Sequence, residues 1–282
     1  MTTVLETLDK GTAYLTKKGI EDARRNMQML VAHQLSCTRM DLYLRFDQPL
    51  EESDLIPLRD LLKRRGEGVP LQHLLGTVQF HRRDFKTDAR ALIPRPETEE
   101  LAEWLLKNVQ LPADARILDM GCGSGVLGLT LAAENPAAKV TLADISPEAL
   151  SLTKENAAQL EIANVELIES DLFSALGDAK FDLIVANLPY VPEADRASLS
   201  REVNHDPDLA LFGGPDGLDV IRRFVPEAAK RLLPGGWLAL EIGIDQAPQT
   251  EALLRAAGLT DLLTLKDLSG IARFPTARRS AV

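Results

Sequence analysis

The sequence of 282 residues has only two cysteines, Cys37 and Cys122, and aromatic residues make up 5% of it. So few thiols argue against a disulfide scaffold or a cysteine zinc site, and they are typical of a reducing cytoplasm. No apolar run reaches the roughly 18 residues that a membrane span requires. The first residues, MTTVLETLDKG, lack the basic and apolar regions of a secretory signal. We therefore expect a cytoplasmic protein whose core is mostly Leu, Ala, Val and Ile.

Positive charge is also scarce, and its distribution is uneven. The net charge is -10, yet residues 1–83 carry 13 basic against 11 acidic side chains. The rest of the chain carries 19 basic against 31 acidic side chains. Such an acidic part is a poor partner for duplex nucleic acid, whose binding depends on neutralised phosphates, so we expect no direct DNA binding. The weakly basic first part leaves contact with RNA or an acidic protein open.

Residues 1–75 have the pattern of a small helical domain. Apolar residues recur at helical spacing over Leu5–Leu15 and again over Met27–Leu35. Ser53 is a candidate N-cap for a third helix, and Pro70 opens a further short helical turn. No catalytic pattern is visible in this part of the sequence.

Residues 76–100 are predicted to be a linker with a short hairpin, in which residues 78–80 pair with residues 85–87. The stretch LIPRPETEEL follows, and two prolines keep the backbone around Arg95 extended. Pro96 and the acidic residues after it are typical of the first turn of a helix. The segment is either an ordinary linker or a stiff arm that holds Arg95 over a neighbouring site.

Strands and helices alternate within the remaining predicted domain, residues 101–282. Seven strands are expected, at residues 115–122, 139–146, 165–170, 181–188, 235–243, 263–268 and 272–279. The alternation predicts an α/β fold with a doubly wound, mostly parallel sheet. The last two strands are too close in sequence for a crossover, so one of them must run antiparallel. A helix is expected over residues 217–232, kinked or split by Pro226.

A glycine-rich segment follows the first of these strands and leads into a helix. It consists of Gly121, Cys122, Gly123, Ser124 and Gly125. Glycines at such a place allow a tight turn and let a ligand lie against the backbone. Asp144 ends the next strand, about 20 residues further on, where a ribose-binding acid belongs. With Gly128 the segment also matches the G-x-G-x-x-G pattern, which fits a nicotinamide dinucleotide equally well.

Two further acids favour S-adenosylmethionine over a dinucleotide. Asp119 stands just before the glycines, and its carboxylate suits the cationic amino group of a methionine but repels a pyrophosphate. Asp171 follows the third strand, where it can accept a hydrogen bond from an adenine amino group while Leu172 lies against the ring. Open α/β sheets bind ligands at the carboxyl ends of their strands, so these side chains are expected to converge.

The fourth strand ends in Asn187, Leu188, Pro189 and Tyr190. An amide nitrogen is a poor nucleophile because its lone pair is delocalised, so methylating it requires holding the amide flat and aimed at the methyl donor. The Asn187 side-chain carbonyl can accept one N–H, and the Leu188 backbone carbonyl another, because Pro189 biases Leu188 to an extended conformation. Tyr190 offers a flat face for a planar amide. The alternative is a plain turn with a buried tyrosine.

These motifs, LDMGCGSG, ADIS, ESDLF and ANLPY, resemble those of class I methyltransferases that act on planar amino groups. With LIPRPETEEL, the helical first domain and the closing DLSGIARFPTARR, nearly the whole chain resembles the release-factor glutamine N5-methyltransferase family. The resemblance implies a seven-stranded class I methyltransferase sheet. It also implies transfer of a methyl group from S-adenosylmethionine, without a metal, to the glutamine of the Gly-Gly-Gln loop of class I peptide chain release factors.

The resemblance also assigns residues. Gly121–Gly125, Asp144, Leu172 and Asn187 would contact the cofactor, and Asn187–Tyr190 the glutamine, while the helical domain would recognise the release factor. Leu188 stands where the family usually has proline. Three rival functions stay open: a glutamine methyltransferase acting on a ribosomal protein, an adenine N6-methyltransferase, and a catalytically silent S-adenosylmethionine-binding protein.

Overall fold

The structure, a computed structural model, describes residues 2–281. The chain divides into two compact units. The first contains the chain up to Thr77 together with Ser200–His205, and the second contains Val78–Leu199 and everything from Asp206 onward. None of the helices within residues 2–281 combines the length and the apolar character needed to cross a membrane.

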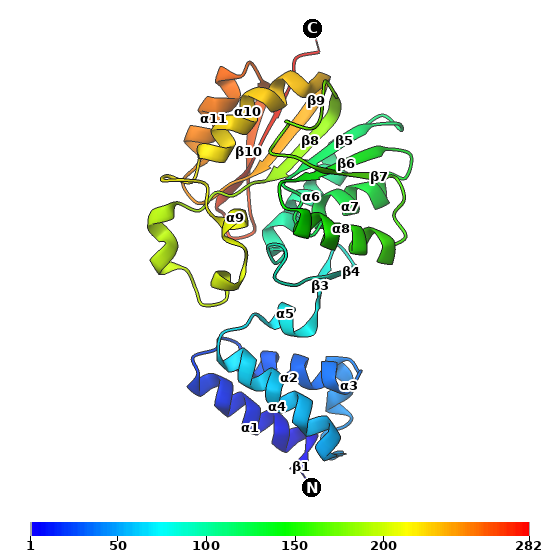
Figure 1. Cartoon of the computed structure of the whole chain (residues 1–282), viewed down its shortest axis with the longest axis vertical. Coiled ribbons are helices and arrows are strands. Elements are labelled where there is room, and N and C mark those ends of the chain that lie inside the picture. The colour runs from blue at the N-terminus through cyan, green and yellow to red at the C-terminus, as the bar shows by residue number, and fades with distance from the viewer. Residues whose placement is uncertain (1, 282) are drawn as a thin grey trace. The chain divides into compact units, whose positions relative to one another are not determined.

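The first unit is helical, as the periodicity predicts (Figure 1). Its elements are β1 (Thr2–Thr3), α1 (Val4–Lys17), α2 (Ala23–Gln34), α3 (Arg39–Tyr43), β2 (Pro49–Leu50), α4 (Glu52–Gly66) and α5 (Leu71–Leu75). Leu8 and Leu15 of α1 pack with Met27 and Leu30 of α2 in a core of its own. Arg65 of α4, which is 2% exposed, forms an ion pair with Glu202, so the Ser200–His205 segment belongs to this unit.

The predicted N-cap at Ser53 is wrong. Helix α4 begins at Glu52, with Glu51 as its N-cap residue. The Asp54 side chain accepts the backbone N–H of Glu51 at 3.2 Å. Asp54 thus acts as the third helical residue of a capping box that starts at Glu51, and this places the start of the helix before Ser53.

The second unit opens with a hairpin and a helix. Strands β3 (Thr77–Phe80) and β4 (Arg83–Lys86) pair, as expected for this segment. Phe80 and Phe85 are buried and meet edge to face, with ring centroids 6.1 Å apart. Helix α6 (Pro96–Asn108) then begins with Pro96 at its first position, as predicted. The Leu92–Arg95 stretch between hairpin and helix passes over the cavity described below.

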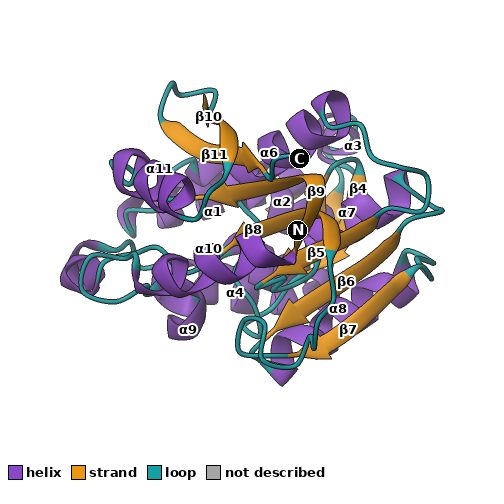
Figure 2. Ribbon diagram, turned by 90° about the horizontal axis from the view of Figure 1, so that it is seen from above, coloured by secondary structure: helices purple, strands orange, loops and turns teal. Residues whose placement is uncertain are grey.

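A seven-stranded sheet forms the centre of the second unit, in the order β10-β11-β9-β8-β5-β6-β7 (Figure 2). Its strands are β5 (Arg116–Met120), β6 (Lys139–Asp144), β7 (Val165–Glu169), β8 (Phe181–Asn187), β9 (Leu232–Glu241), β10 (Thr260–Lys266) and β11 (Ala272–Arg278). Strands β5 to β9 are parallel to their neighbours among themselves, whereas β11 runs antiparallel to both β9 and β10. The predicted α/β fold and the antiparallel closing pair are confirmed.

Helices cover both faces of this sheet. The remaining helices of the unit are α7 (Val126–Glu134), α8 (Pro147–Gln159), α9 (Asp208–Leu211), α10 (Asp219–Arg231) and α11 (Ala247–Ala256). Successive strand residues face opposite sides. Ile117 accordingly packs in one core with α6, α7 and α8, and Leu118 in a second core with α10 and α11. Helix α10 continues through Pro226, so the helix is not split there as the sequence allowed.

The strand order reverses between β5 and β8, which are hydrogen-bonded neighbours although β6 and β7 lie between them in sequence. Met120, Asp144 and Asn187 end β5, β6 and β8, so their backbones reach the same edge of the sheet. Ligands of open α/β sheets bind at this edge, beside the reversal.

Candidate active site

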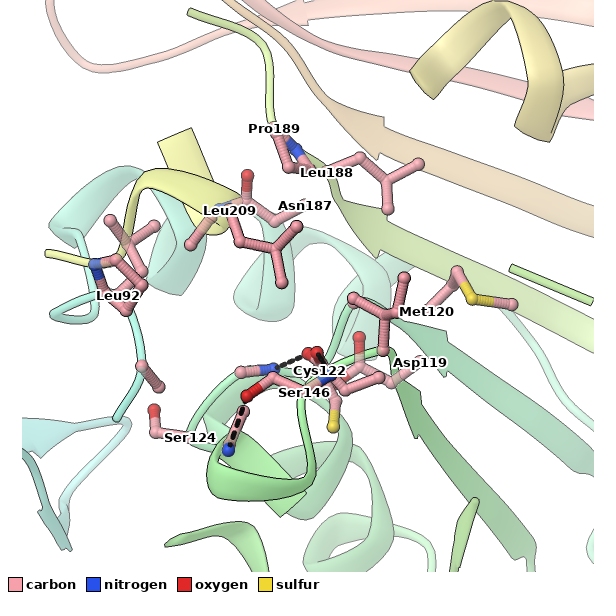
Figure 3. Close-up of a pocket in the computed structure, with 18 of the residues that line it drawn as sticks. Leu92, Asp119, Met120, Cys122, Ser124, Ser146, Asn187, Leu188, Pro189 and Leu209 are labelled. Atoms are coloured by element: carbon pink, nitrogen blue, oxygen red, sulfur yellow. Dashed lines mark hydrogen bonds between the residues drawn. The ribbon is translucent and has the colours of Figure 1, made fainter. Parts of the chain in front are cut away.

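A cavity of about 230 Å³ opens at the carboxyl ends of the strands (Figure 3). It lies wholly within the second unit. The predicted site residues that line it are Asp119, Gly121, Cys122, Gly123, Ser124, Asp144, Asp171, Leu172, Asn187, Leu188 and Pro189. Gly125 and Tyr190 were also predicted for the site, but they are not among the residues that line the cavity. The sequence motifs therefore converge on one place, with two exceptions that have physical causes.

The glycine-rich turn is fixed by the backbone of the neighbouring strand. The N–H groups of Gly121 and Cys122 both donate to the carbonyl of Ala143, at 2.8 and 3.1 Å. Gly121, Gly123 and Gly125 all have positive φ, of 70°, 56° and 82°. A Cβ on Gly125 would lie 2.7 Å from the Thr153 side chain of α8. Gly125 thus permits close packing against a helix and does not face the cavity.

Asp119 lies at the base of the cavity and is 2% exposed. Its Oδ2 accepts the N–H of Gly128 at 2.8 Å, and burial raises the pKa of its carboxyl to about 7. A Cβ on Gly128 would lie 2.8 Å from this oxygen. Gly128, the last glycine of the G-x-G-x-x-G pattern, therefore lets α7 pack closely against β5, and it is not among the residues that line the cavity.

Asp144 is held by two backbone donors. Its Oδ2 accepts the N–H of Gly123 and its Oδ1 that of Ser146, each at 2.9 Å. Burial raises the pKa of this carboxyl above its usual value. A carboxylate has about four acceptor positions, so each oxygen keeps a lone pair for a ligand hydroxyl. The Ser146 hydroxyl accepts from Ala149 N at 3.1 Å, which confirms Ser146 as the N-cap of α8.

Asp171 and Leu172 line the cavity beyond β7. Both carboxylate oxygens of Asp171 accept from Nη2 of Arg223, at 3.0 and 2.8 Å, and both side chains are about half exposed. Leu172 has a φ of 49°, in the left-handed region that leucine rarely adopts. Arg223 itself lines the cavity, and the sequence did not mark it out.

The Asn187 amide is oriented from behind by α6. Its Nδ2 donates to the Thr98 hydroxyl at 3.2 Å, and that hydroxyl donates to Oε2 of Glu241 at 2.6 Å. Leu188 contributes more than a carbonyl, because its side chain is 4% exposed and belongs to the second core of the sheet. A Cβ on Gly121 would lie 3.0 Å from this side chain, so Leu188 also packs against the glycine-rich turn.

Tyr190 points to the same carboxylate. Its hydroxyl donates to Oε1 of Glu241 at 3.4 Å, and its backbone carbonyl accepts from Gln246 Nε2 at 2.9 Å. Burial raises the pKa of the Tyr190 hydroxyl. The ring packs against the core shared by α10 and α11, which explains why it does not line the cavity.

Arg95 lines the cavity from the opposite side. Its Nη2 lies 2.6 Å from Oδ2 of Asp206, whose side chain is fully buried, and Oδ1 of Asp206 accepts the N–H of Ile93 at 3.0 Å. The Leu92–Arg95 stretch is thus tied down as a stiff arm and is no free linker. The sequence left this choice open, and the acid-Pro pair Asp206–Pro207 resembles the family's without revealing that Pro207, Leu209, Ala210 and Phe212 line the cavity.

The sheet order and the glycine-rich cavity are those of a class I methyltransferase. A family model described as "Methyltransferase small domain" matches residues 97–205, and one described as "PrmC N-terminal domain" matches residues 6–76. A solved ribosomal protein L11 methylase from Lactobacillus delbrueckii subsp. bulgaricus superposes with a TM-score of 0.52 at 22% identity. That comparison covers 68% of this chain and 83% of the methylase, and it supports the fold alone.

Curated relatives narrow the class to one family. A release factor glutamine methyltransferase of Geobacter sulfurreducens is 42% identical over 96% of this chain and 95% of the relative. One of Deinococcus radiodurans is 44% identical over 97% of each chain. The chain belongs to the release factor glutamine methyltransferase family.

Proposed function

We propose that this protein transfers a methyl group from S-adenosylmethionine to the side-chain amide nitrogen of a glutamine, namely that of the Gly-Gly-Gln loop of class I peptide chain release factors. The observation that carries the proposal is the placement of Asn187 and the Leu188 backbone in the cavity that the glycine-rich turn also lines. The residues that we assign to the substrate amide and to the cofactor line one cavity, and this supports a direct methyl transfer between them.

The residues of the cavity fit the cofactor. The free lone pairs of Asp144 suit the two ribose hydroxyls, and the buried Asp119 suits a cationic amino group, which would favour its ionised form. Leu172 and Ile145 line the cavity and offer apolar surface to adenine, beside Asp171 for the adenine amino group. When bound, the cofactor supplies an electrophilic methyl group on a sulfonium.

The chain's own contribution to the reaction is positioning. The Asn187 Oδ1 is left free by the bond of its nitrogen to Thr98, so it can accept one N–H of the substrate amide. The Leu188 carbonyl can accept the other, which holds the amide flat with its nitrogen facing the methyl group. The substrate nitrogen held in this way would take the methyl group from the sulfonium, which would be left as a neutral thioether, and the extra proton would then pass from the nitrogen to water. Orientation of this kind is worth about 7–11 kcal/mol in favourable systems.

The proposal is tested by incubating the protein with methyl-labelled S-adenosylmethionine and purified release factors, and mapping the label by mass spectrometry. We expect one added methyl group on the glutamine of the Gly-Gly-Gln loop, and none on a factor whose loop glutamine is replaced by alanine. Parallel reactions contain ribosomal proteins and adenine-containing DNA. Label found there, with none on the release factor, would overturn the proposal in favour of a rival function.

We assign contact with the release factor to the helical unit, in keeping with its match to an N-terminal family domain. Met40 and Tyr43 of α3 and the adjacent Leu44 are 73%, 51% and 89% exposed, which gives this unit an apolar surface. Leu44→Ser should raise KM for the intact factor several-fold, which corresponds to a loss of roughly 1 kcal/mol of binding free energy. Leu268→Ser, at a leucine of the second unit that is 92% exposed, is the matched control. Equal KM values for wild type and Leu44→Ser would contradict the assignment.

A further inference from the structure

A chain of hydrogen bonds runs from Asn187 through Thr98, both of which line the cavity, to the buried Glu241, which does not. We propose that Thr98 and Glu241 are positioning residues that fix which end of the Asn187 amide meets the substrate glutamine. The inference rests on the proposed function, because it assigns these residues to the same methyl transfer. Thr98 lines the cavity, but its hydroxyl is committed to Glu241 and Asn187, so in this account both Thr98 and Glu241 act through Asn187.

The backbone places these three side chains together. Asn187 and Glu241 are direct partners in the parallel pair of β8 and β9, so their side chains leave the same face of the sheet. Thr98 comes from the first turn of α6, where its N–H donates to the Arg95 carbonyl at 3.1 Å. Thr98 is 4% exposed and Glu241 is 2% exposed, so water does not compete for their hydrogen bonds.

The direction of each hydrogen bond between Asn187, Thr98 and Glu241 follows from which of their atoms can donate and which can only accept. An ionised carboxylate only accepts, so the one hydroxyl hydrogen of Thr98 must point to Glu241, at 2.6 Å. The Thr98 oxygen is then left as an acceptor, and it faces Nδ2 of Asn187 at 3.2 Å. If the Asn187 amide were flipped, its Oδ1 would face a lone pair of the Thr98 oxygen. That buried oxygen would then lack the N–H donor that it has in the structure. The carboxylate therefore dictates that Oδ1 of Asn187 faces the cavity.

The second oxygen of Glu241 holds another part of the same motif. The Tyr190 hydroxyl donates to Oε1 at 3.4 Å, while Thr98 donates to Oε2. A buried carboxylate is costly unless hydrogen bonds satisfy it. Glu241 thus organises both ends of the Asn187–Tyr190 motif, and this explains why Tyr190 turns away from the cavity.

Thr98→Val keeps the shape of the side chain and removes the hydroxyl. At saturating cofactor we expect its single-turnover rate on the release factor to fall about 30-fold, by analogy with the loss of one positioned hydrogen-bonding group. KM and cofactor affinity should stay within about threefold, because the hydroxyl that is removed bonds only Glu241 and Asn187 and the shape of the cavity wall is kept. Thr98→Ser keeps the hydroxyl and should restore the rate to within about threefold of wild type. Thr250→Val is the matched control, because Thr250 is fully buried and its hydroxyl has no partner among the described residues.

Glu241→Gln is the second variant, since a neutral amide can donate to Thr98 as well as accept from it. The hydroxyl of Thr98 can then donate to Oδ1 of Asn187, so both orientations of the Asn187 amide become available. We expect a fall in single-turnover rate of about tenfold, with cofactor affinity unchanged by calorimetry. A Glu241→Gln protein that does not fold leaves the Thr98→Val and Thr98→Ser pair as the deciding comparison.

A readout that does not depend on turnover comes from nuclear magnetic resonance of protein labelled with ¹⁵N in asparagine. The side-chain NH₂ signals of Asn187, assigned by their loss in Asn187→Asp, should show slow hydrogen exchange in wild type and faster exchange in Thr98→Val. Wild-type rates and exchange in Thr98→Val would overturn the inference while leaving the proposed function intact. Absence of methylation by the wild-type protein would instead overturn the proposed function.

Discussion

The two halves of the cavity are built in different ways. In the cofactor half, carboxylates are held by backbone N–H groups close in sequence: Asp144 by Gly123, 21 residues away, and Asp119 by Gly128, nine residues away. In the acceptor half, side chains hold side chains across long separations, with 89 residues between Asn187 and Thr98. The two acids of the first half are thus held within the β5–α7–β6 segment, whereas the acceptor half forms only once β8, β9 and α6 have come together.

Asn187→Ala should have the largest effect and should be confined to the acceptor half. Losing one positioned acceptor costs on the order of 2–4 kcal/mol in the transition state, or roughly 30- to 1,000-fold in rate. Single-turnover kinetics at saturating cofactor measures this, and calorimetry should show that cofactor affinity changes far less than the rate. Asn108→Ala, at an exposed asparagine of α6, is the control. If a normally folded Asn187→Ala protein kept wild-type rates, the Asn187–Tyr190 motif would be only a turn and would not orient the substrate amide.

Asp144→Ala should damage the cofactor half alone. Its carboxylate would lose charge-assisted bonds to ribose hydroxyls, worth about 1.5–3 kcal/mol, so affinity for S-adenosylmethionine should fall roughly 10- to 150-fold. The rate at saturating cofactor should change little. Asp182 is a matched control, because it also accepts a backbone N–H, that of Arg116, at the other end of β8. Equal affinities for Asp144→Ala and Asp182→Ala would contradict the ribose role.

A change of pH should act on the acceptor half through Glu241. Burial, with Glu97 adding to it, raises the pKa of this carboxyl to about 7, against the opposing effects of Thr98, Arg273 and the Asn187 side chain; Tyr190 also faces it. Below that pH the neutral acid can donate, which frees Thr98 to bond the wrong end of Asn187. The rate at saturating cofactor should therefore fall about tenfold as the pH drops from about 8 to 6. Thr98→Val should flatten this dependence, and an unchanged pH profile in that variant would contradict the mechanism.

The smallest effect is expected at the rim of the cofactor half. Arg223→Ala removes the ion pair with Asp171, but these side chains are 59% and 50% exposed, and exposed pairs contribute about 0–1 kcal/mol. Cofactor affinity should change less than about fivefold, measured at low and high salt. A larger loss would show that this pair, and not the backbone-held acids, dominates cofactor binding.

The same difference explains what the sequence could predict. The glycine-rich turn, Asp144 and the N-cap Ser146 form their bonds within a short stretch of chain, so a local motif reveals them. The alternation of strands and helices likewise predicted the parallel sheet, and the short connection between the last two strands predicted their antiparallel pairing. Prediction failed at Ser53, because nearby acids compete for the same free backbone donors and no pattern ranks them.

Thr98 and Glu241 could not be identified from the sequence. A threonine in the first turn of a helix and a glutamate after an apolar strand are ordinary, and 143 residues separate them. Tyr190 was expected beside the substrate because its ring is flat, but the bond of its hydroxyl to Glu241 and its packing draw it into the core. Tertiary contacts decide whether a side chain at the end of a strand points into the cavity or into the core, and the sequence motif alone does not reveal this.

A pair of double-mutant cycles tests the division of the cavity most directly, using kcat/KM for methylation of the release factor at a fixed subsaturating cofactor concentration. Asp144→Ala and Asn187→Ala lie in separate halves, so their effects should multiply to within about 0.5 kcal/mol. Thr98→Val and Asn187→Ala act on one hydrogen-bond chain, so adding Thr98→Val to Asn187→Ala should cost almost nothing more. A Thr98→Val effect that persists in full in the Asn187→Ala background would contradict the account.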